Sequence, residues 1–277
     1  MGKFSGRLLA CDIDGTLILG DYLPQCNVEK IAEFVKEGGQ FCLASGRSVD
    51  AARGVLEKIK GYVGPSVMTN GNLIYDYKNE KILFGTPIPD DAKALIFDVA
   101  DKFAEVGLEI HSGRDAFIYK DEKELRDHQL YENTAPRMIG RQDALKLDMH
   151  KALFTCEKPD VFLKIDDIFK ENCKTATTVE VSADIFGRRR VYREILPLGN
   201  SKASMLKKLC EILSISEDKF FAIGDYYNDI AMLKAAHISA CPEDSLDEVK
   251  KVCDYHTVKA QDGAVADFID YLSSKEI

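Results

Sequence analysis

Short apolar runs alternate with helix-length segments near both ends of this sequence, and that alternation restricts the fold more than any other feature. In the first third, apolar runs at 7–11, 40–44 and 66–69 are separated by helical patterns at 28–37 and 48–60. Parallel strands need a crossover of about this length between them. The pattern therefore predicts βαβ units and a parallel sheet.

The same pattern returns in the last third, after a middle section of different character. Late strands are expected in "FFAIGD" and "HISAC", and late helices at 201–213, 229–235, 245–251 and 264–272. The middle carries more polar and β-branched runs, such as "DAFIYKD", "TTVEVSAD" and "RRRVYREIL", with helices at 90–106 and 159–170. Such runs are typical of an antiparallel sheet with one solvated face. The sequence thus predicts an α/β domain, 1–85 and 196–277, split by an inserted α+β domain at 86–195.

Composition limits the class of partner. The net charge of -9 argues against nucleic acid, which favours a basic face, but is compatible with a small anionic ligand. The eight cysteines form no Cys-x-x-Cys pair, so we interpret them as reduced thiols in a reducing compartment. No secretory leader and no apolar run of membrane-spanning length is found. We therefore expect a cytoplasmic protein with no membrane partner.

Two aspartates separated by one residue follow the first apolar run, in the stretch "LLACDIDGTL". Asp12 and Asp14 point to the same side if the segment is extended. Open α/β sheets bind ligands at the carboxyl ends of their strands. Adjacent carboxylates repel each other unless a cation or a proton lies between them. This leaves a metal site or an acid/base pair, whereas a solvated acidic loop would explain a bare Asp-x-Asp equally well.

Three further polar motifs lie at strand or helix ends. "LASGR" places Ser45 and Gly46 after the second strand, where a hydroxyl and turn amides can hold a phosphate. "LPLGNSK" places Lys202 at a helix start, and "AIGDYYNDIAML" places Asp225, Asn228 and Asp229 after a late strand. A surface lysine and a helix cap would explain the last two separately. All four motifs occur together by chance much less often than any one of them alone.

The four motifs, "DIDGTL", "SGR", "GNSK" and "GDYYND", resemble the signatures of the haloacid dehalogenase (HAD) superfamily. The inserted middle domain resembles the type-two (C2) cap of the Cof-type hydrolases, subfamily IIB, as do "TNGNLIYD" and "EILPLGNSKASML". The resemblance implies a Rossmann-like parallel-sheet core with an inserted α+β cap. It also implies a Mg²⁺-dependent phosphatase for a small phosphorylated metabolite, such as a sugar phosphate, acting as a monomer or homodimer.

Residue roles follow from the same resemblance. Asp12 would be the nucleophile that forms an aspartyl-phosphate, and Asp14 the general acid and base. Mg²⁺ would bind a carboxylate oxygen of Asp12, the carbonyl of Asp14 and Asp225, with Asp229 orienting these ligands. The phosphoryl oxygens would be held by Ile13, Ser45, Gly46, Lys202 and Asn228.

The cap would select the leaving group. Its polar candidates for this role are His111, Arg114, Arg141, His150, Arg188, Arg189 and Arg190. For any single arginine of the 188–190 run, a charged solvated edge strand is the commoner explanation. The five histidines show no zinc-motif spacing, so we interpret them as structural.

Two points stay open at the level of sequence. Pro242, Glu243 and Asp244 stand where many family members have a Gly-Asn-Ala turn, so the contacts of this loop are undecided. The alternative functions are a phosphomutase of the phosphomannomutase type, which needs an activating bisphosphate, and a non-catalytic HAD-fold regulator. The intact set of catalytic residues speaks against the regulator, because binding alone needs no second aspartate.

Overall fold

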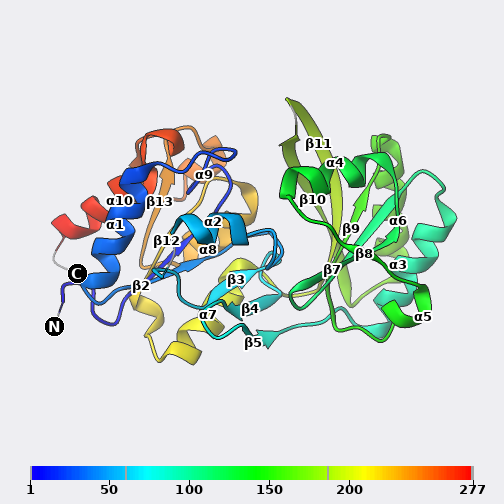
Figure 1. The fold of residues 1–277 in the computed structure, drawn as a ribbon, viewed down its shortest axis with the longest axis horizontal. Coiled ribbons are helices and arrows are strands. Elements are labelled where there is room, and N and C mark those ends of the chain that lie inside the picture. The colour runs from blue at the N-terminus through cyan, green and yellow to red at the C-terminus, as the bar shows by residue number, and fades with distance from the viewer. Residues whose placement is uncertain (1, 60, 186, 276–277) are drawn as a thin grey trace. The chain divides into compact units, whose positions relative to one another are not determined.

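The computed structural model describes residues 2–59, 61–185 and 187–275, which form two compact units (Figure 1). One unit comprises Met1–Arg47, Arg53–Phe84 and Ser201–Ile277, and the other comprises Ser48–Ala52 and Gly85–Asn200. Each unit has its own sheet and its own apolar core. The sequence-derived boundaries at 85/86 and 195/196 concern which segments fold by themselves, and they remain a proposal that is taken up below.

The first unit is built on a five-stranded sheet whose neighbouring strands all pair in parallel. In sheet order the strands are β14 (Tyr255–Thr257), β13 (Ile238–Pro242), β12 (Phe220–Ile223), β1 (Leu8–Cys11) and β2 (Gln40–Leu43). Leu8 and Ala10 pack in one core with α7 (Lys202–Leu213) and α8 (Ile230–Ala235). Helices α1 (Gln25–Lys36) and α10 (Ala264–Ser274) pack together and contact β2 and β14. Helices on both faces explain why the strands are apolar throughout.

A small three-stranded sheet completes the first unit, and here the structure differs from the sequence prediction. The strands are β3 (Ser66–Met68), β4 (Leu73–Asp76) and β5 (Lys81–Gly85), and the short helices are α2 (Arg53–Lys58) and α9 (Asp247–Lys250). The run at 66–69 pairs antiparallel with β4, and it meets the edge of the parallel sheet through an isolated parallel bridge between Ala44 and Val67. The helix expected at 48–60 is shortened to Arg53–Lys58, because the Ser48 hydroxyl accepts the Ala51 N–H and forms a separate turn.

The second unit contains a six-stranded mixed sheet. In order its strands are β10 (Ala176–Ile185), β11 (Arg188–Pro197), β9 (Met149–Thr155), β6 (Gly107–Ser112), β7 (Asp115–Lys120) and β8 (Arg137–Met138). All neighbours pair antiparallel except β7 and β8, so the expectation of a purely antiparallel sheet is wrong at this edge. Helices α3 (Asp90–Lys102) and α6 (Pro159–Asn172) supply apolar residues to the core, and α4 (Lys123–Glu132) and α5 (Arg141–Ala144) complete the unit.

The strand order identifies the edge of the parallel sheet at which a ligand is expected. From β1 the chain passes to β2 on one side, whereas β12 and the later strands lie on the other side. Such a reversal of strand order opens a crevice at the carboxyl ends of the two central strands, here β1 and β12. The predicted α/β fold with an inserted α+β domain is thereby confirmed. Among the described residues, no helix is both long enough and apolar enough to cross a bilayer.

Candidate active site at the carboxyl edge of the parallel sheet

A buried lysine joins two aspartates that are far apart in the sequence. Lys202 Nζ lies 2.7 Å from Asp12 Oδ1 and 2.7 Å from Asp229 Oδ1, and the lysine is 1% exposed. It is the first residue of α7, whose start is fixed by a reciprocal pair of hydrogen bonds between Ser201 and Ser204. The capped helix start therefore places the ammonium group at the end of β1.

Asp229 is held from both sides. Its Oδ1 accepts a hydrogen bond from the Lys202 ammonium group, and its Oδ2 accepts hydrogen bonds from the backbone N–H groups of Asp225 and Tyr226, each at 3.1 Å. This carboxylate is completely buried. Asp229 therefore fixes the loop that follows β12 and leaves few of its own lone pairs for another ligand.

Asp225 lies against the segment that follows β1. The Thr16 hydroxyl donates to Asp225 Oδ1 at 2.7 Å. Gly15 has a φ of +81°, and a Cβ at this position would lie 2.4 Å from Asp225 Oδ2. Glycine is required here both for its backbone conformation and for the close approach of the carboxylate. Gly15 and Thr16, which follow the two aspartates in the sequence, thus position the Asp225 carboxylate.

The charges at this edge need a proton or a further cation to balance them. Burial and the neighbouring carboxylates raise the pKa of Asp12 despite the opposing effect of Lys202, and burial with Asp229 raises the pKa of Asp225 to about 7. Burial alone would lower the pKa of Lys202, but Asp12 and Asp229 outweigh it and raise that pKa. Oxygen atoms of Asp12, Asp225 and Asp229 lie within 4.8 Å of one another. Three carboxylates against one ammonium group leave two negative charges, and an all-oxygen donor set of this charge fits a hard divalent cation.

Asp14 has a partner that sequence reasoning missed. The Arg47 guanidinium contacts its carboxylate twice, with Nη2 2.6 Å from Oδ1 and Nε 2.8 Å from Oδ2. This two-point contact fixes the plane of the carboxylate. The Asp14 side chain remains 46% exposed, in contrast to buried Asp12. The available signal for Arg47 was its place as the last residue of "SGR", directly after a strand.

The predicted phosphate-binding residues lie in a connected set of turns. Ser45 is buried, and its hydroxyl accepts the N–H of Arg47 at 3.2 Å. Asn228 Nδ2 donates to Asn70 Oδ1 at 2.9 Å, and a Cβ on Gly46 would lie 3.0 Å from the Asn70 amide. Asn70, in the left-handed conformation at φ 53°, is the second residue that sequence reasoning missed. Its signal was the Asn-Gly pair within "TNGN". Ile13 is fully buried in the loop after β1.

The chain just beyond the Pro242–Asp244 loop touches this region through a backbone contact. Leu246 N donates to the carbonyl of Asp225 at 3.4 Å, and Asp244 Oδ1 accepts the Ala260 N–H at 3.2 Å. The contact with Asp225 thus comes from Leu246 and not from the Pro-Glu-Asp sequence, whereas the Asp244 side chain supports the turn at Ala260.

The seven candidate specificity residues are spread over the second unit. Arg141 pairs with Asp98 at 2.5 Å and with Asp101 at 3.0 Å on α3, and Arg114 lies 3.7 Å from Asp50. His111 Nε2 lies 3.0 Å from Glu109 Oε1, and His150 Nδ1 accepts the Gly113 N–H at 3.1 Å. Both histidines are buried. The seven residues do not form one continuous set.

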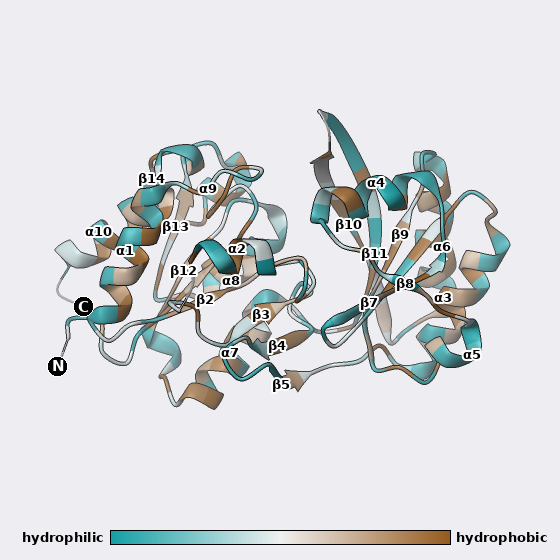
Figure 2. Ribbon diagram, in the orientation of Figure 1, coloured by the Kyte–Doolittle hydropathy of each residue, from teal (hydrophilic) through white to brown (hydrophobic). Residues whose placement is uncertain are grey.

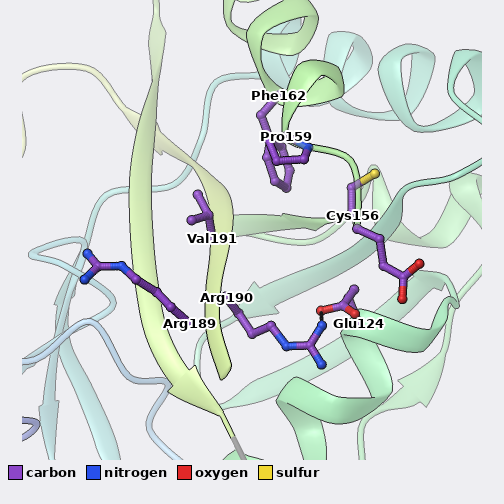
Figure 3. Close-up of a pocket in the computed structure, with 8 residues that line it drawn as sticks. Glu124, Cys156, Pro159, Phe162, Arg189, Arg190 and Val191 are labelled. Atoms are coloured by element: carbon purple, nitrogen blue, oxygen red, sulfur yellow. Dashed lines mark ion pairs between the residues drawn. The ribbon is translucent and has the colours of Figure 1, made fainter. Parts of the chain in front are cut away.

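The arginines at 188–190 differ from one another. Arg188 is exposed, Arg189 donates to the Ser182 hydroxyl at 3.1 Å, and Arg190 pairs with Glu124 and Asp127. Arg189 and Arg190 point to opposite sides of β11 and line a cavity of about 360 Å³ with Phe162 and Cys156 (Figure 3). In the register, residues 188–190 pair with β10, whereas the pairing of β11 with β9 covers 193–195, so the edge-strand explanation still fits this run.

Comparisons with known proteins agree with this geometry. The family model of haloacid dehalogenase-like hydrolases matches residues 9–269. The 5-amino-6-(5-phospho-D-ribitylamino)uracil phosphatase YitU of Bacillus subtilis is 22% identical over 96% of this chain and 97% of its own. The pyridoxal phosphate phosphatase YbhA of Escherichia coli is 24% identical, with 88% and 90% covered. The structure of the subclass IIB sugar phosphatase BT4131 has a TM-score of 0.81 at 15% identity, with 96% and 99% covered. The chain therefore belongs to the haloacid dehalogenase-like hydrolases, and it has the fold of the subclass IIB sugar phosphatase.

Proposed function

We propose that this protein is a Mg²⁺-dependent phosphatase that hydrolyses a small phosphomonoester through an aspartyl-phosphate on Asp12. The observation that carries the proposal is the contact of one buried ammonium group with both Asp12 and Asp229. It fixes one oxygen of Asp12 and leaves the other for attack on phosphorus. Lys202 also provides positive charge where a phosphoryl oxygen would lie.

In the proposed reaction the chemistry divides between the two aspartates of "DIDGT". Asp12 bonds to phosphorus as the bond to the leaving oxygen breaks, and protonated Asp14 donates its proton to that oxygen. Asp14, now a carboxylate, takes a proton from water, which attacks phosphorus and restores Asp12. The half-exposed side chain of Asp14 can exchange protons with solvent, and Arg47 orients it between these two roles.

The residues present fit the divalent cation that the family uses. Asp12, the carbonyl of Asp14 and Asp225 would hold Mg²⁺, and Asp229 would fix the loop that carries Asp225. Bound Mg²⁺ supplies charge that offsets the repulsion between a carboxylate and a phosphate. Asp225 Oδ2 lies close to Gly15, which supports this assignment, because it brings a ligand oxygen next to the backbone of the first motif.

The substrate is proposed by class. YitU, YbhA and BT4131 are each named for a small phosphorylated compound or a sugar phosphate. We infer that this chain acts on a sugar phosphate or a similar phosphomonoester, as a monomer or homodimer in the cytoplasm. Eight free cysteines, six of them buried, support a reducing compartment.

Selectivity is proposed to reside in the second unit, because every candidate substrate shares the phosphoryl group that the first unit would bind. Substitutions of Arg188 and Arg189 test this proposal best, because Arg190 already forms ion pairs with two carboxylates. Exchanging either for alanine should change ratios of kcat/KM among substrates by a factor of about 10, as expected for one lost polar contact. Unchanged ratios in both variants would remove this run from the specificity set.

The experiment that tests the function is a phosphate-release screen over phosphorylated metabolites with Mg²⁺, with Asp12→Asn as the inactive control. Release of inorganic phosphate by the wild type alone supports the phosphatase. Transfer of the phosphate within a sugar, dependent on an added bisphosphate, would identify a mutase instead. No turnover of any compound, with binding retained, would favour the regulator.

A further inference from the structure

Helix α4 of the second unit is fastened to its sheet by polar groups. Figure 2 shows this helix mostly in hydrophilic colours, and Leu130, one of its few apolar residues, is 71% exposed. Yet Glu124, His128 and Gln129 on the same helix are buried. Ordinary helices bury an apolar stripe against a sheet. The polar groups between α4 and the sheet therefore need their own account.

Three of these groups converge. Glu109 on β6 and His128 and Glu132 on α4 each offer a ligand atom, and the three atoms lie within 4.8 Å of one another. His128 Nε2 lies 3.7 Å from Glu132 Oε1. Gln129 Nε2 donates to Glu109 Oε2 at 2.9 Å and fixes that carboxylate from the side. Side chains at positions i and i+4 of a helix share a face, so His128 and Glu132 reach the same point.

The cluster contains buried polar atoms without hydrogen-bond partners in the described part of the chain. These are Nδ1 of His128, Oε2 of Glu132 and both ring nitrogens of His111. His111 Nε2 lies 3.0 Å from Glu109 Oε1, which is an ion-pair contact when the imidazole is protonated. Native proteins rarely leave such atoms unpaired, because each costs the loss of its bonds to water.

Two of the converging side chains are carboxylates with little access to solvent. Lys151 is paired with Glu194 at 2.9 Å, so its ammonium group is largely balanced. Glu109 is 1% exposed and the side chain of Glu132 is 10% exposed. Together with His128 they form a donor set of two carboxylates and one imidazole within 4.8 Å, which a divalent ion can bridge.

We propose that Glu109, His128 and Glu132 form a second metal site, distinct from the aspartates of the first unit, which binds a divalent transition metal of the Zn²⁺ type. The mixture of imidazole nitrogen and carboxylate oxygen, with no thiolate, suits Zn²⁺ and similar ions and is unlike the all-oxygen set preferred by Mg²⁺. The ion ties α4 to β6. The sequence hides it, because the ligands lie 19 and 4 residues apart and follow no zinc-motif spacing.

The direct test is metal stoichiometry with Zn²⁺ as the probe. Wild-type protein is loaded with Zn²⁺, dialysed against buffer with millimolar Mg²⁺ to occupy the first site, and analysed by mass spectrometry of the metal. The expected result is about one Zn²⁺ per wild-type chain. The affinity for Zn²⁺ should fall at least tenfold in His128→Gln and in Glu132→Gln. His150→Gln, which changes another buried histidine of the same unit, should retain the ion. Wild-type protein without Zn²⁺, or equal binding in all variants, would overturn the proposal.

A second measurement uses the wild-type protein, so it does not depend on how the variants fold. X-ray absorption at the zinc edge of the wild-type protein should show nitrogen and oxygen neighbours at about 2.0–2.2 Å and no sulfur. A sulfur neighbour at about 2.3 Å would place the ion on the cysteines and exclude the site. The Zn²⁺-loaded wild type should also melt at a higher temperature than the metal-free protein, and Glu132→Gln should show no such rise.

Discussion

Lys202 and Asp12 are 190 residues apart in sequence, and their side chains meet at 2.7 Å inside the first unit. Neither group is satisfied by water, because both are buried. The contact is thus a buried ion pair, shared with Asp229, and it links the stability of the unit to the chemistry of its nucleophile. The predictions below test this link and its surroundings.

Replacing the nucleophile should abolish turnover and spare the fold. We expect Asp12→Asn to lower the rate of phosphate release by at least about 1,000-fold, because an amide cannot form the covalent intermediate. Asp21→Asn, which changes an exposed aspartate nearby, serves as the matched control. Circular dichroism should be unchanged in both variants. Activity of the Asp12 variant above about a tenth of the wild type would refute the assignment.

Removing the shared ammonium group should destabilise the protein. In Lys202→Met, Asp12 and Asp229 are left buried without their cation, and we expect a loss of about 3–5 kcal/mol in the free energy of unfolding. The double variant Lys202→Met with Asp229→Asn should recover part of this loss, because it removes one of the two unpaired charges. Urea titrations of the four proteins in the cycle measure the coupling. Strict additivity of the two changes would contradict the shared ion pair.

Chelation should remove activity reversibly. EDTA followed by gel filtration is expected to abolish phosphate release, and added Mg²⁺ to restore it, because three clustered carboxylates need a cation for catalysis. Asp225→Asn should need at least a tenfold higher Mg²⁺ concentration for half-maximal activity. The assay is to be run on protein whose metal content has been measured. Full activity of metal-free protein would argue decisively for another mechanism.

Acid should destabilise the second unit through His150. Burial lowers the pKa of this histidine below its ordinary 6.5, helped by Lys93 against the opposing effect of Asp148. The folded state then binds fewer protons than the unfolded state, so the contribution of His150 is present above pH 6.5 and is lost as the pH falls below it. Melting temperatures of the wild type should therefore fall more steeply from pH 7 to pH 5 than those of His150→Gln. Parallel curves would show that another group controls this range.

The domain boundaries can be tested by deletion. Replacing 86–195 with a short Gly-Ser linker should leave a soluble α/β protein that unfolds cooperatively, because the parallel sheet and its helices lie outside that span. A thermal transition and dispersed amide NMR signals would support the proposed core. A chain that expresses only as a molten or unfolded species would argue against independent folding of 1–85 with 196–277.

The parallel sheet and its polar strand ends could be predicted because their signals are local. Strands such as β1 and β12 are uniformly buried and apolar, and the motif residues follow them directly. Strand β9 was missed because His150 and Lys151 interrupt its apolar run, although every residue in it is buried. Helix α4 was missed for a related reason, since it buries polar residues and so lacks an apolar stripe. In both cases the pairing of buried polar groups is a tertiary property without periodicity.

The contacts between site residues also could not be predicted from the sequence. That Arg47 contacts Asp14, and that Asn70 contacts Asn228, depends on turns brought together by the fold. The residue types were visible, but a distance of 158 positions between the two asparagines carries no local pattern. The same holds for the cap candidates, where Arg141 and Arg190 are committed to carboxylates on other helices.

The neighbouring positions of β1 and β12 in the sheet have a consequence for synthesis on the ribosome. Residues 8–11 emerge first, but their partner at 220–223 emerges more than two hundred residues later. During that interval one side of β1 lacks its neighbour, and Asp12 lacks its ammonium partner until residue 202 has been made. The whole inserted segment is therefore synthesised, and can begin to fold, before β12 is available to pair with β1. A nascent chain that stops short of Phe220 therefore carries an open strand edge and lacks Asp225, Asn228 and Asp229, which is the kind of intermediate that chaperones bind.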